Sequence, residues 1–594
     1  MKEPASLGRW WRTLRPLPVR SHVERGVNEA RKRLWLPVLP GLVAIWQRQG
    51  AQQAAKANVA ALRNLGAALE STPPPAVAEL LAGRLVLAGR EVAAFPPEDW
   101  QLPGARPLEV YEAHYLDWVD ALTAAAVRSP MDAANGGGAL ALAGAALGRW
   151  NLAAPHLDKA WEPYPRARRT LACLRAAARL THLAHHGRDR LRPQHRELGE
   201  RLLATAAAAA AGLGLLAERH LGGNHLLCDR IAAACASAVF GGSEAATAAL
   251  AAECERQFAR DGSHVEASPM YHALAIEDLL GLQRLRADSP NTAHFQLDPL
   301  LARACAWLAA VRHPDGHLPA FGDSDPDALV HLHLTRTALA HTPPGRTDPR
   351  LSAWTSRRGA HFAIVHTAPP AYAPQPGHAH ADQLSVEWSW RDTRIFGDAG
   401  LCGYEGDANR SLNRSAASHS TLDIPGVPST ELWSTFRVGA RGRMRHLQWG
   451  EQGAWHWLGA IFEWPAGTHR HLRFVAHAAD GHLVIADRLR AAAPPDAAIG
   501  RLLLAPGVTW QTDQTLHCAA GNLQVATNVP MEMHEGLRFL GRGATWNGPE
   551  LRYPVTCNDA SWLHIGAPSH QAATQARADL TPLWHSLAAQ LDVG

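Results

Sequence analysis

Residues 377–391 read Gly-His-Ala-His-Ala-Asp-Gln-Leu-Ser-Val-Glu-Trp-Ser-Trp-Arg. From Leu384 onward apolar and polar side chains alternate, which is typical of a β-strand with one buried face. Every second side chain of a strand points to the same side, so we expect His378, His380 and Asp382 to lie together where this strand begins. Such polar groups are costly to bury unless they bind a metal, a substrate or each other. The segment therefore predicts a functional site in a β domain.

The chain changes character near residue 350. Before that point alanine, leucine and arginine recur at helical spacing between Pro-, Gly- and Asp-rich breaks, which is typical of paired helices stacked in a solenoid or toroid. Beyond the linker 341–349, alternating runs separated by turns predict an antiparallel β-sandwich. We expect a helical domain in residues 1–345 and a β domain in 350–594 that carries the His/Asp site. The predicted helices are 167–181, 196–220, 228–240, 243–260 and 273–287, and the predicted strands are 361–366, 384–390, 455–462, 472–476, 483–487 and 502–504.

Bulk properties narrow the class of protein. The 594 residues are 47% hydrophobic and 19% charged, as in a globular multidomain protein, and the net charge of +4 argues against nucleic-acid binding. The eight cysteines show no C-x-x-C spacing, so reduced thiols are expected. No signal peptide is recognisable, and the apolar run 202–217 is shorter than the ~20 residues that span a bilayer. We therefore expect no stable membrane insertion and favour the cytoplasm, with the periplasm as the alternative; a homo-oligomer is left open.

The first 33 residues are basic, with nine Lys and Arg against three Glu. This pattern predicts either a solvated amphipathic helix or a surface that contacts an acidic polymer or a membrane. Trp10 and Trp11 stand between two arginines, and Trp433 lies four positions before Arg437. Flat aromatic rings beside cations suit acidic sugars, although packing beside a snorkelling arginine is the simpler interpretation.

A group of candidate metal ligands extends the His-x-His segment. Asp398 follows a strand-like run, and His419 stands just before another. Two histidines and a carboxylate on neighbouring strands suit zinc, so His380, Asp398 and His419 are the candidate ligands. The chain has 33 histidines, and the alternative is a chance set of surface or hydrogen-bonded side chains in loops.

Two polar clusters stand out in the helical half. Gly222 and Gly223 precede Asn224 and His225, where glycine allows close backbone approach and Asn224 is suited to cap the following helix. Further on, Ser268-Pro269 is a good helix start that places Tyr271 in the first turn, where it can face a cleft between the domains. The alternatives are an ordinary cap with a solvated histidine, and a buried tyrosine with a satisfied hydroxyl.

Taken together, these motifs resemble the heparinase II/III family of polysaccharide lyases. The pieces occur in the family's order, and the resemblance covers roughly residues 14–488. They are Trp-Glu-Pro-Tyr-Pro at 161–165, Gly-Asn-His-Leu-Leu at 223–227, Asp-Gly-Ser-His-Val-Glu-Ala-Ser-Pro-Met-Tyr-His at 261–272, His-Pro-Asp-Gly at 313–316, Gly-Asp-Ser at 322–324, the segment 377–382, Ser-His-Ser-Thr at 418–421 and Trp-Ser-Thr-Phe-Arg at 433–437.

The resemblance implies an N-terminal (α/α) toroid of paired helices followed by a C-terminal antiparallel β-sandwich. It also implies cleavage of a uronic-acid-containing acidic polysaccharide by β-elimination, which leaves an unsaturated uronate end. Glycosaminoglycan, alginate-like and bacterial capsular polymers are all candidates. The implied roles are carboxylate binding by Asn224 and His225, acid/base catalysis by Tyr271 and His378, binding of a structural zinc ion by His380, Asp398 and His419, and support of this site by Asp382.

The sequence departs from the family pattern at two positions. Cys228 stands where members often have an acidic residue, which leaves the substrate range and the effect on activity open. Ser420 replaces an asparagine, with less expected consequence. A non-catalytic glycan-binding or polysaccharide-biosynthesis-associated protein on the same scaffold, and a zinc-dependent hydrolase, are the alternative functions. The sequence does not distinguish endo from exo action or syn from anti elimination.

Overall fold

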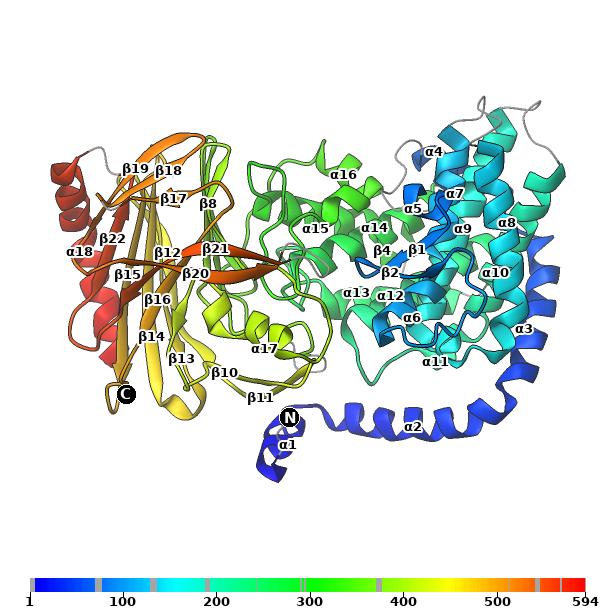
Figure 1. The fold of residues 1–594 in the computed structure, drawn as a ribbon, viewed down its shortest axis with the longest axis horizontal. Coiled ribbons are helices and arrows are strands. Elements are labelled where there is room, and N and C mark those ends of the chain that lie inside the picture. The colour runs from blue at the N-terminus through cyan, green and yellow to red at the C-terminus, as the bar shows by residue number, and fades with distance from the viewer. Residues whose placement is uncertain are drawn as a thin grey trace.

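A computed structural model shows a helical domain beside a β domain, with the N-terminal helices running along one edge of both (Figure 1). This arrangement confirms the predicted fold class. The structure describes residues 6–69, 77–128, 136–186, 193–242, 244–288, 291–292, 295–369, 376–511, 513–539, 545–566 and 569–592.

The helical domain is built from paired helices around α9, which packs against α4, α7, α10 and α12. A second set of contacts joins α12 to α13 and α14, and α14 to α15 and α16. Two short hairpins, β1–β2 and β3–β4, lie in the connections. The elements are α3 (Leu39–Ala54), α4 (Val59–Ala68), α5 (Val77–Leu81), β1 (Arg84–Leu87), β2 (Arg90–Ala94), α6 (Pro107–Tyr115), α7 (Asp117–Arg128), α8 (Gly136–Ala153), α9 (Pro163–His186), α10 (Pro193–Ala210), α11 (Leu213–Leu216), α12 (Gly223–Phe240), α13 (Glu244–Gln257), α14 (Pro269–Leu285), β3 (Asn291–Thr292), β4 (Phe295–Gln296), α15 (Leu297–Val311) and α16 (His333–Leu339).

Small side chains explain how these helices approach so closely. A Cβ atom on Gly66 of α4 would lie within 2.3 Å of the Ala178 carbonyl oxygen of α9. A Cβ atom on Gly50 of α3 would lie within 2.4 Å of the Ala204 carbonyl oxygen of α10. Glycine at these two crossings lets the backbones meet and bury the alanine-rich faces between them.

The predicted helix 196–220 is wrong in its extent. It ends as α10 at Ala210, and a short helix α11 follows Gly212, whose φ of +68° is a conformation that glycine adopts readily. Among the described residues, His195–Leu216 is the one helical stretch long and apolar enough, by length and composition, to cross a membrane. In this fold α10 packs against α3 and α9 of the toroid.

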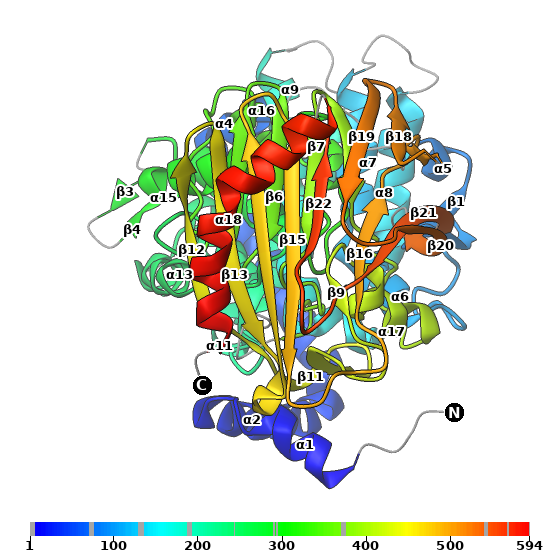
Figure 2. The same ribbon diagram turned by 90° about the vertical axis from the view of Figure 1, so that its left-hand side faces the viewer.

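The β domain is a sandwich of two eight-stranded antiparallel sheets. One sheet has the order β12-β13-β14-β15-β22-β19-β18-β17, and the other has the order β20-β21-β16-β8-β7-β6-β5, with β9 pairing β16. Their facing side chains form one core, and α18 covers the outer face of the first sheet (Figure 2). The elements are β5 (Ala353–Arg358), β6 (His361–His366), β7 (Val386–Trp390), β8 (Thr393–Gly397), α17 (Ala408–Arg414), β9 (Leu422–Asp423), β10 (Thr430–Trp433), β11 (Arg437–Arg441), β12 (Arg443–Gln452), β13 (Trp455–Glu463), β14 (His469–Ala478), β15 (Leu483–Ala491), β16 (Ile499–Leu504), β17 (Thr509–Trp510), β18 (Thr515–Cys518), β19 (Gly521–Thr527), β20 (Glu532–Phe539), β21 (Thr545–Pro554), β22 (Ser561–Ile565) and α18 (His570–Asp592).

The N-terminal helices form an arm that joins the two domains. Helix α2 (Val19–Trp35) leaves the toroid next to α3, and α1 (Leu7–Leu14) packs on strand β11 of the β domain. Figure 1 shows this arm, in blue, passing along the lower edge of the molecule. The hairpin β10–β11 that receives it lies beside α17, between the arm and the sandwich.

Candidate active site at the domain interface

The His-x-His segment is a loop and not the start of a strand, so the prediction that its three polar side chains share one face is wrong. Strand β7 begins only at Val386, because Leu384 adopts a φ of +61° that no strand tolerates. Because these residues are in a loop, their side chains do not alternate between two faces, and each contacts a different partner. His378 contacts Glu266, His380 contacts Asp323, and Asp382 accepts the Gly322 N–H at 2.8 Å and lies 3.2 Å from His366.

Glu266 joins the two domains at this loop. Its Oε2 accepts a hydrogen bond from Nδ1 of His378 at 2.7 Å, and its Oε1 accepts the Asn224 backbone N–H at 2.7 Å. The Glu266 side chain is only 1% exposed. Burial disfavours its charge, but His378 and these hydrogen bonds outweigh burial and lower the pKa of Glu266. An ionised carboxylate therefore holds His378 by Nδ1 and leaves Nε2 as the atom that can face a substrate.

Tyr271 lies against the same histidine. Ser268 caps α14 and accepts the Tyr271 N–H at 3.3 Å, as the sequence predicts. The Tyr271 ring stacks on His378 with centroids 4.0 Å apart, and its hydroxyl is 2.6 Å from the hydroxyl of Tyr404. Burial and the neighbouring Tyr404 raise the pKa of Tyr271 well above its usual value, so it keeps its proton at neutral pH.

Asn224 does not cap α12, contrary to the sequence prediction. The helix begins one residue earlier, and its cap position is Gly222, whose φ of +67° accounts for the double glycine. Because Asn224 lies inside the first turn, its amide is not used for capping: its Oδ1 is buried without a hydrogen-bond partner in the described part of the chain. This oxygen can accept a hydrogen bond from a ligand.

His225 is held by a second carboxylate. Its Nδ1 lies 2.7 Å from Oε2 of Glu218, and its ring stacks on Tyr164 with centroids 4.3 Å apart. Burial lowers the pKa of His225, but Glu218 outweighs burial and the net effect raises it. The imidazole is thus favoured as a cation beside Asn224, where a ligand carboxylate would be neutralised.

Cys228 is a buried neutral thiol one turn below His225. Burial raises its pKa, so it does not replace the negative charge of an acidic residue. The nearby cation Arg168 is instead paired with Asp278 of α14 at 2.7 Å. The carboxylate that pairs with Arg168 therefore comes from another helix.

The three predicted metal ligands lie close together but do not converge. Nδ1 of His419 is 2.7 Å from Oδ1 of Asp398, and the rings of His380 and His419 are 5.2 Å apart. Nε2 of His380 is instead 2.8 Å from Asp323. Within the described ranges no group of three or more His, Cys, Asp or Glu is arranged to hold a metal ion. Nδ1 of His380 and Nε2 of His419 are, however, buried without hydrogen-bond partners in the part of the chain that the structure describes, which fits a role as metal ligands.

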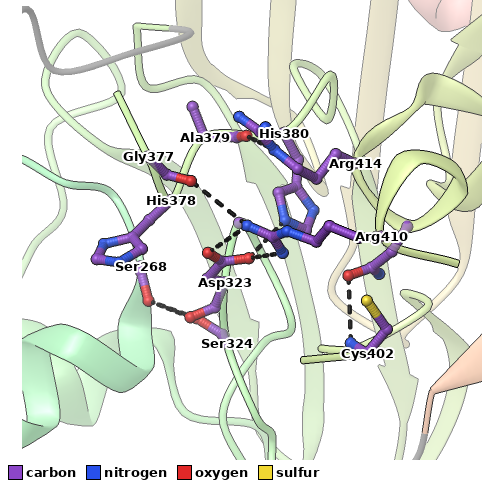
Figure 3. A network of polar contacts seen from close by, with 12 residues as sticks. Ser268, Asp323, Ser324, Gly377, His378, Ala379, His380, Cys402, Arg410 and Arg414 are labelled. Atoms are coloured by element: carbon purple, nitrogen blue, oxygen red, sulfur yellow. Dashed lines mark hydrogen bonds and ion pairs between the residues drawn. The ribbon is translucent and has the colours of Figure 1, made fainter. Parts of the chain in front are cut away.

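Arginines of α17 fix the backbone of the His-x-His loop. Arg410 forms a two-pronged ion pair with Asp323, with Nη2 to Oδ2 at 2.8 Å, and also reaches the Gly377 carbonyl (Figure 3). Arg414 donates from Nε to the Ala379 carbonyl at 3.0 Å. Arg410 and His380 together keep the pKa of the buried Asp323 well below its ordinary value. His378 and His380 consequently point in different directions from a rigid loop (Figure 3).

Sequence reasoning missed four residues of this arrangement: Glu266, Asp323, Tyr404 and Arg410. Glu266 and Asp323 lie inside recognised sequence motifs, but those motifs do not indicate which residues the two carboxylates contact. Tyr404 and Arg410 follow Asp398 in a region without periodicity. No local pattern marks them, because their contacts are with residues 133 and 87 positions away.

Comparison with known proteins agrees with this architecture. A model of the heparinase II/III N-terminus matches residues 216–344, and one described as heparinase II/III-like, C-terminal, matches residues 350–557. Together they cover more than half of the chain. No curated protein sequence gives a significant match.

Solved structures share the fold at low sequence identity. A crystal structure of heparinase III superposes with a TM-score of 0.62 at 17% identity, covering 84% of this chain and 85% of that one. The heparan sulfate lyase HepC from Pedobacter heparinus gives a TM-score of 0.53 at 15% identity, covering 89% of this chain and 88% of that one. At such identities the likeness is one of fold.

Proposed function

This chain belongs to the heparinase II/III family of polysaccharide lyases, and we propose that it cleaves an acidic polysaccharide at a uronate residue by β-elimination. The observation that carries the proposal is the contact across the domain interface. Asn224, Glu266 and Tyr271 come from the toroid, and His378 comes from the sandwich, yet one chain of contacts links them.

The first requirement of the reaction is to stabilise charge on the uronate carboxylate. The proton to be removed lies next to that carboxylate and is very weakly acidic, so the developing enolate-like dianion needs hydrogen bonds and positive charge. The side chain of Asn224 is not used to cap the helix, so its amide N–H₂ can donate to the carboxylate, and His225 is favoured as a cation by Glu218. These two neighbours would bind the carboxylate together.

The second requirement is a base for the C5 proton and an acid for the leaving oxygen at C4. Glu266 accepts from Nδ1 of His378, so Nε2 is the ring nitrogen left to act as the base. Tyr271 keeps its proton and is the acid. Their rings are stacked 4.0 Å apart, so both groups would act from one side of the sugar, the arrangement that a syn elimination uses.

After the elimination His378 carries an extra proton and Tyr271 has lost its own, so both must return to their starting protonation states. His378 gives its extra proton to water, and Tyr271 regains one from water; the Tyr404 hydroxyl, 2.6 Å from that of Tyr271, can relay it by passing on its own proton as it accepts another. The Tyr404 hydroxyl is the hydrogen-bond partner of Tyr271 in this structure, and the leaving oxygen of the sugar would take its place.

One candidate zinc ligand, His380, lies in the same loop as His378, and its ring is 5.2 Å from that of His419. We propose that His380, Asp398 and His419 hold a zinc ion whose charge ties the loops of the β domain together. His378 is two residues from His380, and so the ion would fix the loop that carries the base.

The test is an ultraviolet assay for the double bond of an unsaturated uronate. Heparan sulfate comes first because the solved relatives are named heparinase and heparan sulfate lyase, and chondroitin sulfate and alginate complete the panel. New absorbance and a product mass without added water would support elimination. Cleavage with addition of water would favour the zinc-dependent hydrolase, and tight binding without cleavage would favour a glycan-binding protein.

A further inference from the structure

One face of helix α2 in the N-terminal arm is apolar and open to solvent. Successive residues of a helix are about 100° apart, so four apolar side chains of α2 fall within about a quarter of its circumference. They are Val19, Val23, Val27 and Leu34, which we call the apolar stripe. Val19 is 78% and Leu34 is 73% exposed, and the other two are at least half exposed. The stripe is therefore exposed along most of the helix.

The opposite, polar face of α2 is the one that contacts the toroid. Nδ2 of Asn28 lies 3.3 Å from Nε2 of His220, and Nζ of Lys32 lies 3.9 Å from Oε1 of Glu162. Asn28 and Lys32 are one turn apart, on the side of the helix that faces away from the apolar stripe. A surface helix normally turns its apolar face toward the protein core, and α2 has the reverse orientation. Such an exposed apolar face is typical of a surface that binds something outside the chain.

Helix α1 also leaves apolar side chains uncovered. Leu7 and Trp11, one turn apart, are 90% and 64% exposed. Another side of α1 is docked on the β10–β11 hairpin, where the Trp433 indole donates to Oγ1 of Thr13 at 2.9 Å. In both views the arm forms the lower margin of the molecule (Figures 1 and 2). An extended surface could therefore approach both helices.

Basic side chains flank the apolar stripe. By helical position Arg20 and Arg31 lie on one side of it and Arg33 lies on the other. The side chains of Arg20 and Arg33 are 75% and 79% exposed. Residues 7–35 carry eight Lys and Arg against two Glu, a net charge of +6, whereas the whole chain has a net charge of +4. The positive charge is thus concentrated in the arm, and the rest of the chain is net negative.

The charge decides among the surfaces that could cover this apolar face. A second copy of the chain, docked stripe to stripe, would bring the same positive charge against itself. An acidic polysaccharide would pair with the arginines but offers little apolar surface to cover the valines and leucines. An anionic lipid bilayer supplies both, because its acyl chains take up the apolar side chains and its headgroups attract the flanking cations.

We propose that the N-terminal arm binds the surface of an anionic lipid bilayer, with the apolar stripe, Leu7 and Trp11 at the boundary between headgroups and acyl chains. Helix α2 lies in the plane of that surface and does not cross the bilayer, because its 17 residues include many charges. This binding does not depend on the proposed function. It would hold the toroid and the sandwich beside a membrane whatever the substrate of the active site is.

The experiment measures sedimentation of the full chain with sucrose-loaded vesicles. One set of vesicles contains equal parts of phosphatidylglycerol and phosphatidylcholine, and the other contains phosphatidylcholine alone. The test variant is Val23→Gln/Val27→Gln, which removes apolar surface without changing the charge; glutamine is a better helix former than valine, so α2 is retained. The matched control is Val330→Gln/Met533→Gln, which changes two apolar side chains of similar exposure outside the arm. Melting temperatures confirm that each variant folds.

We expect the wild-type protein to bind the anionic vesicles and the Val23→Gln/Val27→Gln variant to bind them about tenfold more weakly, with a change of less than about twofold in the control. Val23→Leu/Val27→Leu keeps the face apolar and should bind at least as well as wild type. Binding should weaken on phosphatidylcholine alone and when NaCl is raised from about 0.1 to about 0.5 M, because the arginines then lose the attraction of the headgroups.

Equal binding of the Val23→Gln/Val27→Gln variant and wild type, or no binding of wild type to the anionic vesicles, would overturn the inference. Two measurements without lipid identify a competing occupant: sedimentation velocity of the protein alone, and calorimetry with heparan sulfate. A dimer or a polysaccharide complex that is lost in the Val23→Gln/Val27→Gln variant, in a protein that ignores vesicles, would assign the face to that partner instead. Vesicle binding is measured without substrate, so its outcome is separate from that of the lyase assay.

Discussion

Replacing Glu266 by glutamine tests whether one carboxylate orients the catalytic histidine. The glutamine side chain has the same size, but only one of its two terminal atoms can accept a hydrogen bond. In the wild-type protein both oxygens accept, from Nδ1 of His378 and from the Asn224 N–H, each at 2.7 Å. In the Glu266→Gln variant the amide nitrogen either faces the Asn224 N–H, which repels it, or donates to Nδ1 of His378, which then carries its proton on Nε2 and cannot act as the base.

The expected magnitude follows from the strength of the lost contact. A hydrogen bond to a charged group contributes about 1.5–3 kcal/mol, and about 1.4 kcal/mol corresponds to tenfold in rate. Glu266→Gln should therefore lower kcat about 10- to 150-fold, with a smaller change in KM because the substrate does not touch Glu266 itself. The assay is the ultraviolet rate with the best substrate of the panel. Glu266→Asp, which keeps the charge but cannot reach both donors, should recover only part of the rate.

The matched control is Glu277→Gln in α14, the helix that begins just after Glu266. Glu277 accepts the backbone N–H groups of Leu334 and Thr335, at 3.2 and 2.8 Å, and contacts neither His378 nor Tyr271. We expect its kcat to stay within about twofold of wild type. If Glu266→Gln retains full activity at an unchanged melting temperature, Glu266 does not position the base and the mechanism proposed for His378 is wrong.

Three other outcomes are expected. Tyr271→Phe should lower kcat by about 10²–10⁴ while the melting temperature stays near wild type, since it removes the acid but keeps the ring stacked; a fully active variant would refute the assignment. Glu218 raises the pKa of His225, so substrate affinity should fall as pH rises through that raised pKa. Glu218→Gln should move this fall to lower pH in a plot of KM against pH, and an unchanged profile would contradict the role of the cation. His380→Ala should reduce the zinc content measured by atomic emission to well below one ion per chain and lower the melting temperature; equal zinc in variant and wild type would exclude this ligand set.

Local patterns in the sequence predicted the architecture well. Strand β6 has the predicted bounds, and the strands around Trp455, Leu472 and Leu483 lie where alternation places them. The capped start of α14 is also as predicted. Its serine accepts a backbone N–H of the first turn, and its proline fixes φ near the helical value, so both effects act between near neighbours in the sequence. Such features depend on a few consecutive residues, which is the range over which periodicity and capping act.

Local patterns did not predict which residues the side chains of the His-x-His segment contact. The sequence determined that Asn224, Tyr271 and His378 are present in recognisable motifs, and that a helical part precedes a β part. Only the tertiary structure decided that His378 turns to Glu266, 112 residues away, while His380 turns to Asp323. The physical reason is that one backbone dihedral at Leu384 ends the alternation, and side-chain directions in a loop are then set by distant partners across the domain interface.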